Sequence, residues 1–231
     1  MFKSRKRQPK LTDRQGEGAV KGVALLLPGG AVRSHFGPLK IAELGLRELQ
    51  VELTERGRPH GIAVHLLRYR YAGWNGADAD TATDTRWALA ELAARYGEVP
   101  VVLIGNSLGG RAAFWEAGDP RVVGVAGIAP WLPEGDPVAH LAGRQVLIIH
   151  GDRDRSAASA AKSLAYAERA RAVVPGLARY EAAGGNHYLV KQADPVRALT
   201  TAFVLSVLGP EPSPLVAGEL HTPLPPRAPA A

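Results

Sequence analysis

The chain of 231 residues contains no cysteine. Without cysteine, the protein cannot form a disulfide, use a thiolate nucleophile or hold zinc through sulfur. It also lacks a long apolar run, because the richest early stretch, residues 24–27, is far too short to cross a bilayer. No apolar stretch of signal-peptide length follows the basic N-terminal residues, so we expect a cytoplasmic protein without a membrane span.

Negative charge is scarce at the start of the chain. The formal net charge is +6. Before residue 15 the sequence contains several basic residues and a single acidic one, Asp13. The rest of the chain is therefore nearly neutral and lacks the basic face of a nucleic-acid-binding domain, so no nucleic-acid partner is expected. We expect residues 1–20 to form a flexible, solvated leader. The alternative is a leader that recruits nucleic acid or an acidic membrane through Lys3, Arg5, Lys6, Arg7, Lys10 and Arg14.

After the leader, short apolar runs alternate with helical patterns. The runs are continuously apolar, which is typical of parallel strands covered on both faces. This order predicts an α/β fold, a three-layer α/β/α sandwich whose mostly parallel sheet has about six strands. One domain suffices for this length, and we place it at 21–208. The expected strands lie near 23–27, 62–67, 99–104, 122–128, 146–149 and 178–182, and the expected helices near 39–53, 84–96, 108–117, 157–173 and up to 208.

The last part of the chain, 209–231, is rich in proline and has little apolar periodicity. Such a composition predicts an extended or disordered tail. The alternative is a tail that lies across the body of the protein.

The most informative segment is PVVLIGNSLGGRAAFWEA at 100–117, where an apolar strand turns into a helix. Ser107 stands at the turn, between Gly105 and Gly109. A strand-to-helix turn this tight brings backbone against backbone, so a Cβ at either glycine would collide. This pattern predicts a nucleophile elbow that presents the Ser107 hydroxyl.

A serine hydroxyl needs a base, and the base needs a carboxylate to orient it. In the order serine, acid, histidine, each residue follows a later strand of the sheet, so the histidine must come late in the chain. Of seven histidines only His187 and His221 qualify, and His221 lies in the proline-rich tail. We therefore predict His187 as the base. Asp154 is the preferred acid, with Asp152 and then Asp136 as alternatives.

A tetrahedral intermediate also needs donors for its oxyanion. The amide of Leu108, directly after the nucleophile and at a helix N-terminus, is one expected donor. The second should come from PGG at 28–30, where the first strand of the domain ends. Gly30 is our prediction, with Ala31 next, and the alternative is an ordinary glycine turn.

Four motifs in order, PGG at 28–30, GNSLGG at 105–110, HGDRD at 150–154 and GGNH at 184–187, resemble those of the α/β-hydrolase superfamily. The phrases RYRYAGWNG, IAPWLPEGDP and GDRDR resemble those of small bacterial, dienelactone-hydrolase-like members. The resemblance implies an acyl-serine mechanism on an ester, lactone, thioester or amide, without metal or organic cofactor. Dienelactone hydrolases proper use a cysteine, which this chain lacks, and many relatives carry histidine where this chain has Asn106.

The resemblance also implies a minimal core without a large cap, because the connector between 128 and 146 is short. An uncapped site should be open and favour short or strained small-molecule acyl substrates. A protein that binds small molecules on the same scaffold without catalysis is the alternative function. By topology, the residues expected to line the pocket are Ala31, Trp74, Asn75, Asn106 and Trp131.

Overall fold

The computed structural model describes residues 7–14, 19–38 and 40–225. Its centre is an eight-stranded sheet with the order β1-β3-β2-β4-β5-β6-β7-β8. Every neighbouring pair is parallel except β1 and β3, which are antiparallel. The mostly parallel α/β fold is therefore confirmed, whereas the expected six strands are corrected to eight. The strands are β1 (Lys10–Arg14), β2 (Gly22–Leu27), β3 (Ile62–Arg68), β4 (Val101–Asn106), β5 (Val122–Ile128), β6 (Gln145–Gly151), β7 (Ala178–Ala182) and β8 (Thr222–Pro223).

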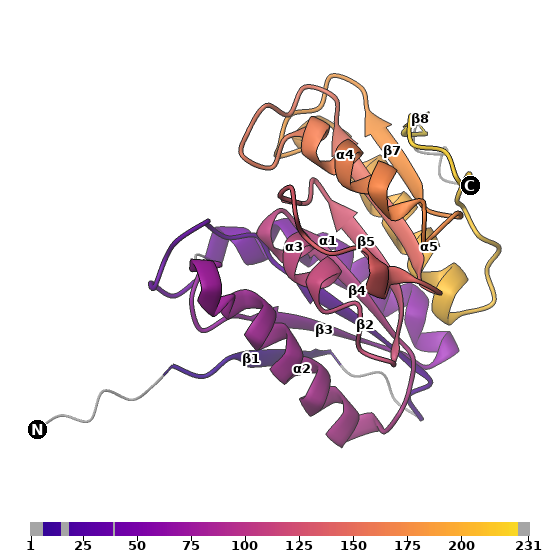
Figure 1. Cartoon of the computed structure of the whole chain (residues 1–231). Coiled ribbons are helices and arrows are strands. Elements are labelled where there is room, and N and C mark those ends of the chain that lie inside the picture. The colour runs from indigo at the N-terminus through magenta and orange to yellow at the C-terminus, as the bar shows by residue number, and fades with distance from the viewer. Residues whose placement is uncertain (1–6, 15–18, 39, 226–231) are drawn as a thin grey trace, which may run out of the picture.

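Helices cover both faces of the sheet (Figure 1). Successive strand residues point to opposite faces, so along β2 Leu25 joins one core and Leu26 the other. The core with Leu25 is closed by α2 (Asp80–Tyr96), α3 (Leu108–Trp115) and α4 (Ala160–Ala170). The core with Leu26 is closed by α1 (Lys40–Gly57) and α5 (Ala193–Leu208). Two closed cores explain why the strands are apolar throughout rather than alternating.

The two strands that the sequence did not predict lie at the edges of the sheet. Strand β1 falls inside the segment expected to be a flexible leader, where Leu11 packs against the core and the Thr12 hydroxyl donates to the carbonyl of Leu66 at 3.1 Å. Strand β8 falls inside the proline-rich tail and pairs with β7, and Leu220 just before it is buried. The described part of the tail, 209–225, thus packs against the body of the protein, which was the alternative to an extended or disordered tail.

The topology opens a crevice at the carboxyl ends of β2 and β4. These neighbouring strands are in register so that Leu27 lies opposite Gly105. The helices that follow them, α1 and α3, cover opposite faces of the sheet. The segments that follow β2 and β4 therefore diverge from the same edge of the sheet. Ligand sites of open α/β sheets lie at such points.

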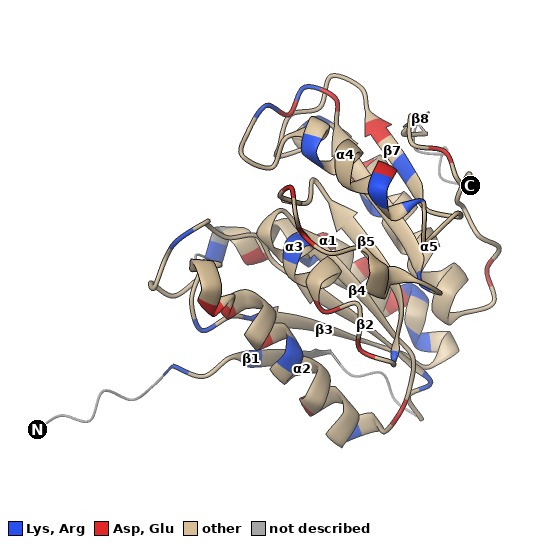
Figure 2. Cartoon of the chain, viewed as in Figure 1, with Lys and Arg blue, Asp and Glu red and all other residues tan. Residues whose placement is uncertain are grey.

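Charges of both signs are interspersed over the described part of the chain (Figure 2). The leader residues Lys3, Arg5 and Lys6 lie outside the described residues. None of the helices that the structure describes is both long and apolar enough to span a membrane.

Candidate active site

Ser107 stands between β4 and α3 in a backbone conformation that few non-glycine residues adopt, with φ of 53° and ψ of −114°. Backbone hydrogen bonds hold the turn, because the Ser107 amide donates to the carbonyl of Ile128 at 3.0 Å and its carbonyl accepts from the Trp131 amide at 2.9 Å. Strain of this kind persists only where the surrounding structure enforces it. The turn is thus fixed by β5 and the loop that follows it.

The flanking glycines make this turn possible through close backbone contact. A Cβ at Gly109 would overlap the carbonyl oxygen of Leu27 at the end of β2. A Cβ at Gly105 would overlap the carbonyl oxygen of Gly109. Both positions therefore exclude any side chain, as the sequence pattern required.

A chain of hydrogen bonds leads away from the Ser107 hydroxyl. Its Oγ lies 2.9 Å from Nε2 of His187, and Nδ1 of His187 lies 2.7 Å from Oδ2 of Asp154. When Nδ1–H donates to the carboxylate, Nε2 is left as an acceptor for the serine proton. The structure thus brings together three side chains that the sequence separates by up to 80 positions. Asp152 and Asp136 take no part, because Asp152 is exposed and Asp136 pairs with Arg111.

Asp154 is the most strongly held member of this chain. The Ser156 amide donates to Oδ1 at 2.9 Å, and His150, which is completely buried, donates from Nε2 to Oδ2 at 2.9 Å. Burial alone would raise the pKa of Asp154, but the hydrogen bonds from Ser156, His187 and His150 lower it to about 2. The carboxylate is therefore ionised at neutral pH and available to stabilise an imidazolium.

His150 contacts the acid as well, and the sequence did not indicate this role, because a histidine that precedes the acid in the chain does not fit the order expected for the base. Burial lowers the pKa of His150 to about 4, although the hydrogen bond to Asp154 opposes the shift. The neutral ring donates to Asp154 through Nε2, and Nδ1 has no partner among the described residues. Its place in HGDRD, four residues before the acid at the end of a buried strand, is the signal that could have found it.

Two backbone amides near Ser107 are free to bind an oxyanion. Within the described residues, neither the Gly30 amide nor the Leu108 amide has a hydrogen-bond acceptor. The Ala31 amide, the second choice from the sequence, already donates to the carbonyl of Ala72 at 2.7 Å. A Cβ at Gly30 would overlap that same carbonyl oxygen, so the close approach of the two loops requires glycine there.

A cavity of about 830 Å³ opens beside the serine. Its walls come from the loop after β2, from α1 and the start of α5, and from 187–189, and both Ser107 and His187 line it. Buried leucine, isoleucine and valine side chains make most of the enclosed wall, whereas Phe36 and Tyr188 at its rim are each 81% exposed. A serine hydroxyl that is hydrogen-bonded to an imidazole at the wall of an apolar cavity is an arrangement that could support nucleophilic catalysis on an organic molecule.

Comparison with solved structures fits this architecture. A serine hydrolase without a lid from Xanthomonas campestris aligns with a TM-score of 0.61 at 18% identity, over 88% of this chain and 91% of that one. The chain has the α/β-hydrolase fold. A thermophilic carboxylesterase cloned from a metagenomic library aligns with a TM-score of 0.64 at 18% identity, over 87% and 90% of the two chains. Est1E from Butyrivibrio proteoclasticus, solved with ferulic acid bound, gives 0.64 at 14% identity, over 86% and 95%.

No protein-family model and no curated protein matches the sequence. The similarity in structure therefore identifies the fold, and the resemblance indicated by the motifs is confirmed at that level. Between β5 and β6 the chain carries only one short 3-10 helix, Ala139–Leu141, so it has no cap at that position.

Three of the residues expected to line the pocket do not line this cavity. Ala31 and Asn106 line the cavity, but Trp74, Asn75 and Trp131 do not. The guanidinium carbon of Arg111 lies 3.9 Å from the ring centroid of Trp74 and 4.6 Å from that of Trp131. The two tryptophans lie on the α3 side of the elbow, whereas this cavity opens on the side of α1 and α5.

Asn75 supports the cavity without lining it. Its side chain accepts from the Ser34 amide at 2.8 Å and donates to the Ser34 carbonyl at 3.1 Å, which holds the loop after β2. It also donates to Asp80 at 2.8 Å. Asn75 therefore links the wall of the cavity to the start of α2.

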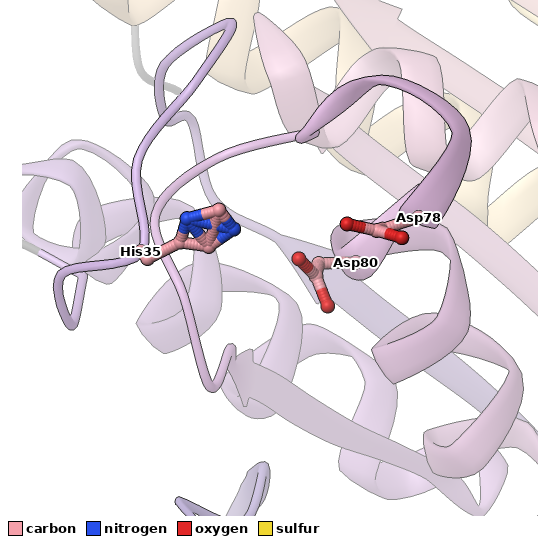
Figure 3. A group of neighbouring side chains, drawn as sticks. All are labelled: His35, Asp78 and Asp80. Atoms are coloured by element: carbon pink, nitrogen blue, oxygen red, sulfur yellow. The ribbon is translucent and has the colours of Figure 1, made fainter.

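Asp80 belongs to a group with His35 and Asp78 whose ligand-type atoms lie within 4.8 Å of one another (Figure 3). Both carboxylate oxygens of Asp80 are already engaged, Oδ1 by Arg70 at 3.3 Å and Oδ2 by Asn75 at 2.8 Å. His35 and Asp78 are exposed. The group is explained by these loop contacts and none of its residues lines the cavity.

Proposed function

We propose that the protein is a serine hydrolase that cleaves an ester-type acyl bond in an ester, lactone or thioester. The observation that carries the proposal is the continuous hydrogen-bonded chain from Ser107 through His187 to Asp154, which begins at the wall of an apolar cavity. The same three residue types in this geometry activate serine on several unrelated folds. Neighbours in fold that are a carboxylesterase and a protein that binds ferulic acid make esters the first substrates to test.

In the acylation step, the Ser107 oxygen attacks the acyl carbon while Nε2 of His187 takes its proton. The carbonyl oxygen becomes an oxyanion, which the amides of Gly30 and Leu108 bind, and the loss of one such donor commonly costs about 3 kcal/mol in the transition state. Asp154 stabilises the imidazolium that forms. His187 then gives the proton to the leaving oxygen or sulfur, the carbon–heteroatom bond breaks, and the acyl group remains on Ser107.

Deacylation repeats the sequence with water. His187 takes a proton from a water molecule that attacks the acyl carbon, the oxyanion forms again between the same amides, and Ser107 recovers its proton as the acid leaves. No residue changes its net protonation over the cycle. The mechanism therefore needs a charged Asp154 and a neutral His187 at the start of each turnover.

A panel of p-nitrophenyl esters and a fluorophosphonate probe test this proposal. Ser107→Ala should lose almost all turnover, about a millionfold in kcat, and should not take up the probe, because the attacking oxygen is gone. Its circular dichroism and melting temperature should stay close to those of the unaltered protein.

Ser206→Ala is the matched control, since Ser206 lies on α5 with its hydroxyl bonded to the Phe203 carbonyl and does not line the cavity. It should keep wild-type turnover and labelling. Ester hydrolysis that survives in Ser107→Ala would refute the role of Ser107. A folded, unaltered protein that neither hydrolyses the panel nor takes up the probe would favour the non-catalytic binding protein.

A further inference from the structure

We propose that the slot between α1 and α5 is an acyl-binding site for an uncharged, apolar acyl group longer than acetyl, and that Gly45 sets how much of it can enter. This inference rests on the proposed function, because it names the part of the substrate that Ser107 would retain. It differs from the expectation, based on the missing cap, that short acyl groups would be preferred.

The slot runs along one side of α1. Ala42, Gly45, Leu46 and Leu49 all line the cavity, and their i, i+3, i+4, i+7 spacing puts them on one face of the helix. The span from 42 to 49 covers roughly 10 Å of helix at the usual rise per residue. An acetyl group would occupy a small part of this length, whereas a longer acyl chain would replace water along the apolar wall.

The facing wall is equally apolar. Val196 of α5, Leu189 before it and Ile128 at the end of β5 line the cavity, and each is less than a tenth exposed. Together with Leu46 and Leu49 they enclose the part of the cavity that is shielded from solvent. Exposed Phe36 and Tyr188 mark the opposite, open part.

This asymmetry favours the acyl group as the occupant of the slot. The leaving alcohol or thiol must depart and water must enter before deacylation, which requires the open rim. The acyl group stays bonded to Ser107 throughout, so its burial persists through both steps. Apolar contacts along the slot would therefore hold the reacting carbon in place for water attack.

The charges in the slot select against an acyl group with a terminal carboxylate. Among the residues that line the cavity, only Glu48 and Arg197 carry a permanent charge. The Arg197 guanidinium already contacts Glu48 at 2.7 Å, Glu52 at 2.8 Å and Asp194 at 2.6 Å. With three carboxylates around it, Arg197 does not offer a free cation to a substrate anion.

Gly45 is solvent-exposed and lies at the mouth of the slot, where a side chain has room. A Cβ added there would meet no atom within 4 Å, and the φ of this helical residue needs no glycine. Glycine lowers the stability of a helix interior, so its presence in the middle of α1 has a local cost, and it leaves the mouth of the slot unobstructed. A larger side chain at 45 would narrow this mouth and so limit how much of the acyl chain can enter.

The experiment measures kcat/KM for p-nitrophenyl esters from acetate to octanoate. In the unaltered protein, kcat/KM should rise about threefold to fourfold for each methylene that becomes buried. Gly45→Leu should lower the ratio of octanoate to acetate at least tenfold, and Ala193→Leu on the facing helix should act in the same direction. Gly45→Ala should lower it less, and Arg47→Leu, on the exposed side of α1 and outside the cavity, should keep the wild-type ratio.

A second series with a fixed acetyl group and alcohols of increasing length separates the acyl from the leaving group. Length dependence in the alcohol series alone would overturn the assignment, and so would an acyl profile that both slot variants leave unchanged. A monosuccinyl ester preferred over its neutral counterpart would contradict the charge argument. Fluorophosphonate labelling of Ser107 with a flat acyl profile would refute the slot and leave the hydrolase proposal standing, whereas absence of both labelling and hydrolysis would refute both.

Discussion

Two regions flank the elbow of Ser107. Side chains of the protein fill one of them, and the other contains a cavity. On the α3 side, the protein fills the space itself, since Arg111 lies between Trp74 and Trp131 and forms two hydrogen bonds of 2.8 Å to Asp136. On the other side, mostly small and aliphatic residues of α1, α5 and the neighbouring loops surround a cavity of about 830 Å³. Trp74 and Trp131, which the sequence suggested as pocket residues, thus pack around Arg111. The cavity instead opens on the side of α1 and α5.

Among the variants that compare these two regions, the largest effect is expected from the hydrogen-bonded chain that begins at the wall of the cavity. Asp154→Asn should lower kcat on the order of ten-thousandfold, because the amide stabilises the wrong tautomer of His187 and cannot balance an imidazolium. The decrease should be the same for every acyl length. A changed ratio of kcat/KM for octanoate to that for acetate would show that Asp154 also affects the shape of the slot. The catalytic residues and the acyl-binding residues would then not be separable.

The next largest effect is expected on stability, and it tests whether Arg111, packed against Trp74 and Trp131 and paired with Asp136, has a structural role. Arg111→Met leaves the mostly buried Asp136 unpaired, so the free energy of unfolding should fall by about 3 kcal/mol. Urea denaturation measures the loss, and Arg56→Met, whose pair with Glu211 is partly exposed, should cost less than about 1 kcal/mol. The preference for acyl length should not change in either variant. If Arg111→Met folds stably but loses the preference, the comparison of the two regions is wrong.

A third variant probes His150, which belongs to neither region. Its pKa is about 4 in the folded protein against 6.5 for the free side chain, so between these values the unfolded chain binds a proton that the folded one does not. Stability should therefore fall as pH decreases from 6.5 towards 4, by roughly 3 kcal/mol in total from this group. His150→Gln, which keeps a donor for Asp154, should flatten that dependence in melting curves recorded from pH 7 to 4.5.

The titration of Asp154 should not contribute to the pH dependence between pH 7 and 4.5. Its lowered pKa contributes stability that is complete above the unfolded value near 4 and is lost only as pH falls towards about 2. An identical pH dependence in His150→Gln and the unaltered protein would mean that His150 is not a buried neutral group.

The smallest expected effect separates the glycine of the slot from those of the elbow. Gly45→Ala should raise the free energy of unfolding by about 0.5–1 kcal/mol, since the new methyl meets no atom and alanine is the better helix former. Gly109→Ala should destabilise the protein, because its Cβ would overlap the Leu27 carbonyl. Chemical denaturation of both variants provides the comparison, and a destabilised Gly45→Ala would mean that the slot is narrower than the structure has it.

The sequence predicted those features that local patterns determine. Continuous apolar runs predicted the six central strands, and the spacing of glycines around Ser107 predicted a turn that the backbone contacts of Gly105 and Gly109 explain. Strand β1 was missed because its five residues contain a single apolar side chain, Leu11. Two residues of β8 are too few to produce any pattern.

The position of the pocket could not be predicted, because it depends on which face of the sheet each helix covers. Helix α1 has an apolar stripe that in sequence indicates core packing, and Leu46 and Leu49 do join the core while also lining the cavity. Trp74 and Trp131 follow strands whose ends approach the elbow, but nothing local indicates that Arg111 would occupy the space between them. His150 was missed for a different reason, since its role is to hold the acid and not to move a proton.

The C-terminal segment has a consequence for handling the protein. Arg179 of β7 is almost fully buried because 209–225 passes over it, and its guanidinium donates to the Leu220 carbonyl at 2.9 Å. Tyr180 donates to the carbonyl of Pro214 at 2.9 Å, and β8 pairs with the outer side of β7. A chain shortened to residue 209 would uncover a buried cation and a row of unpaired backbone groups, an edge that readily recruits strands from other molecules. A recombinant form of the protein should therefore keep residues 209–225, and an affinity tag should be added after residue 231 and not replace them.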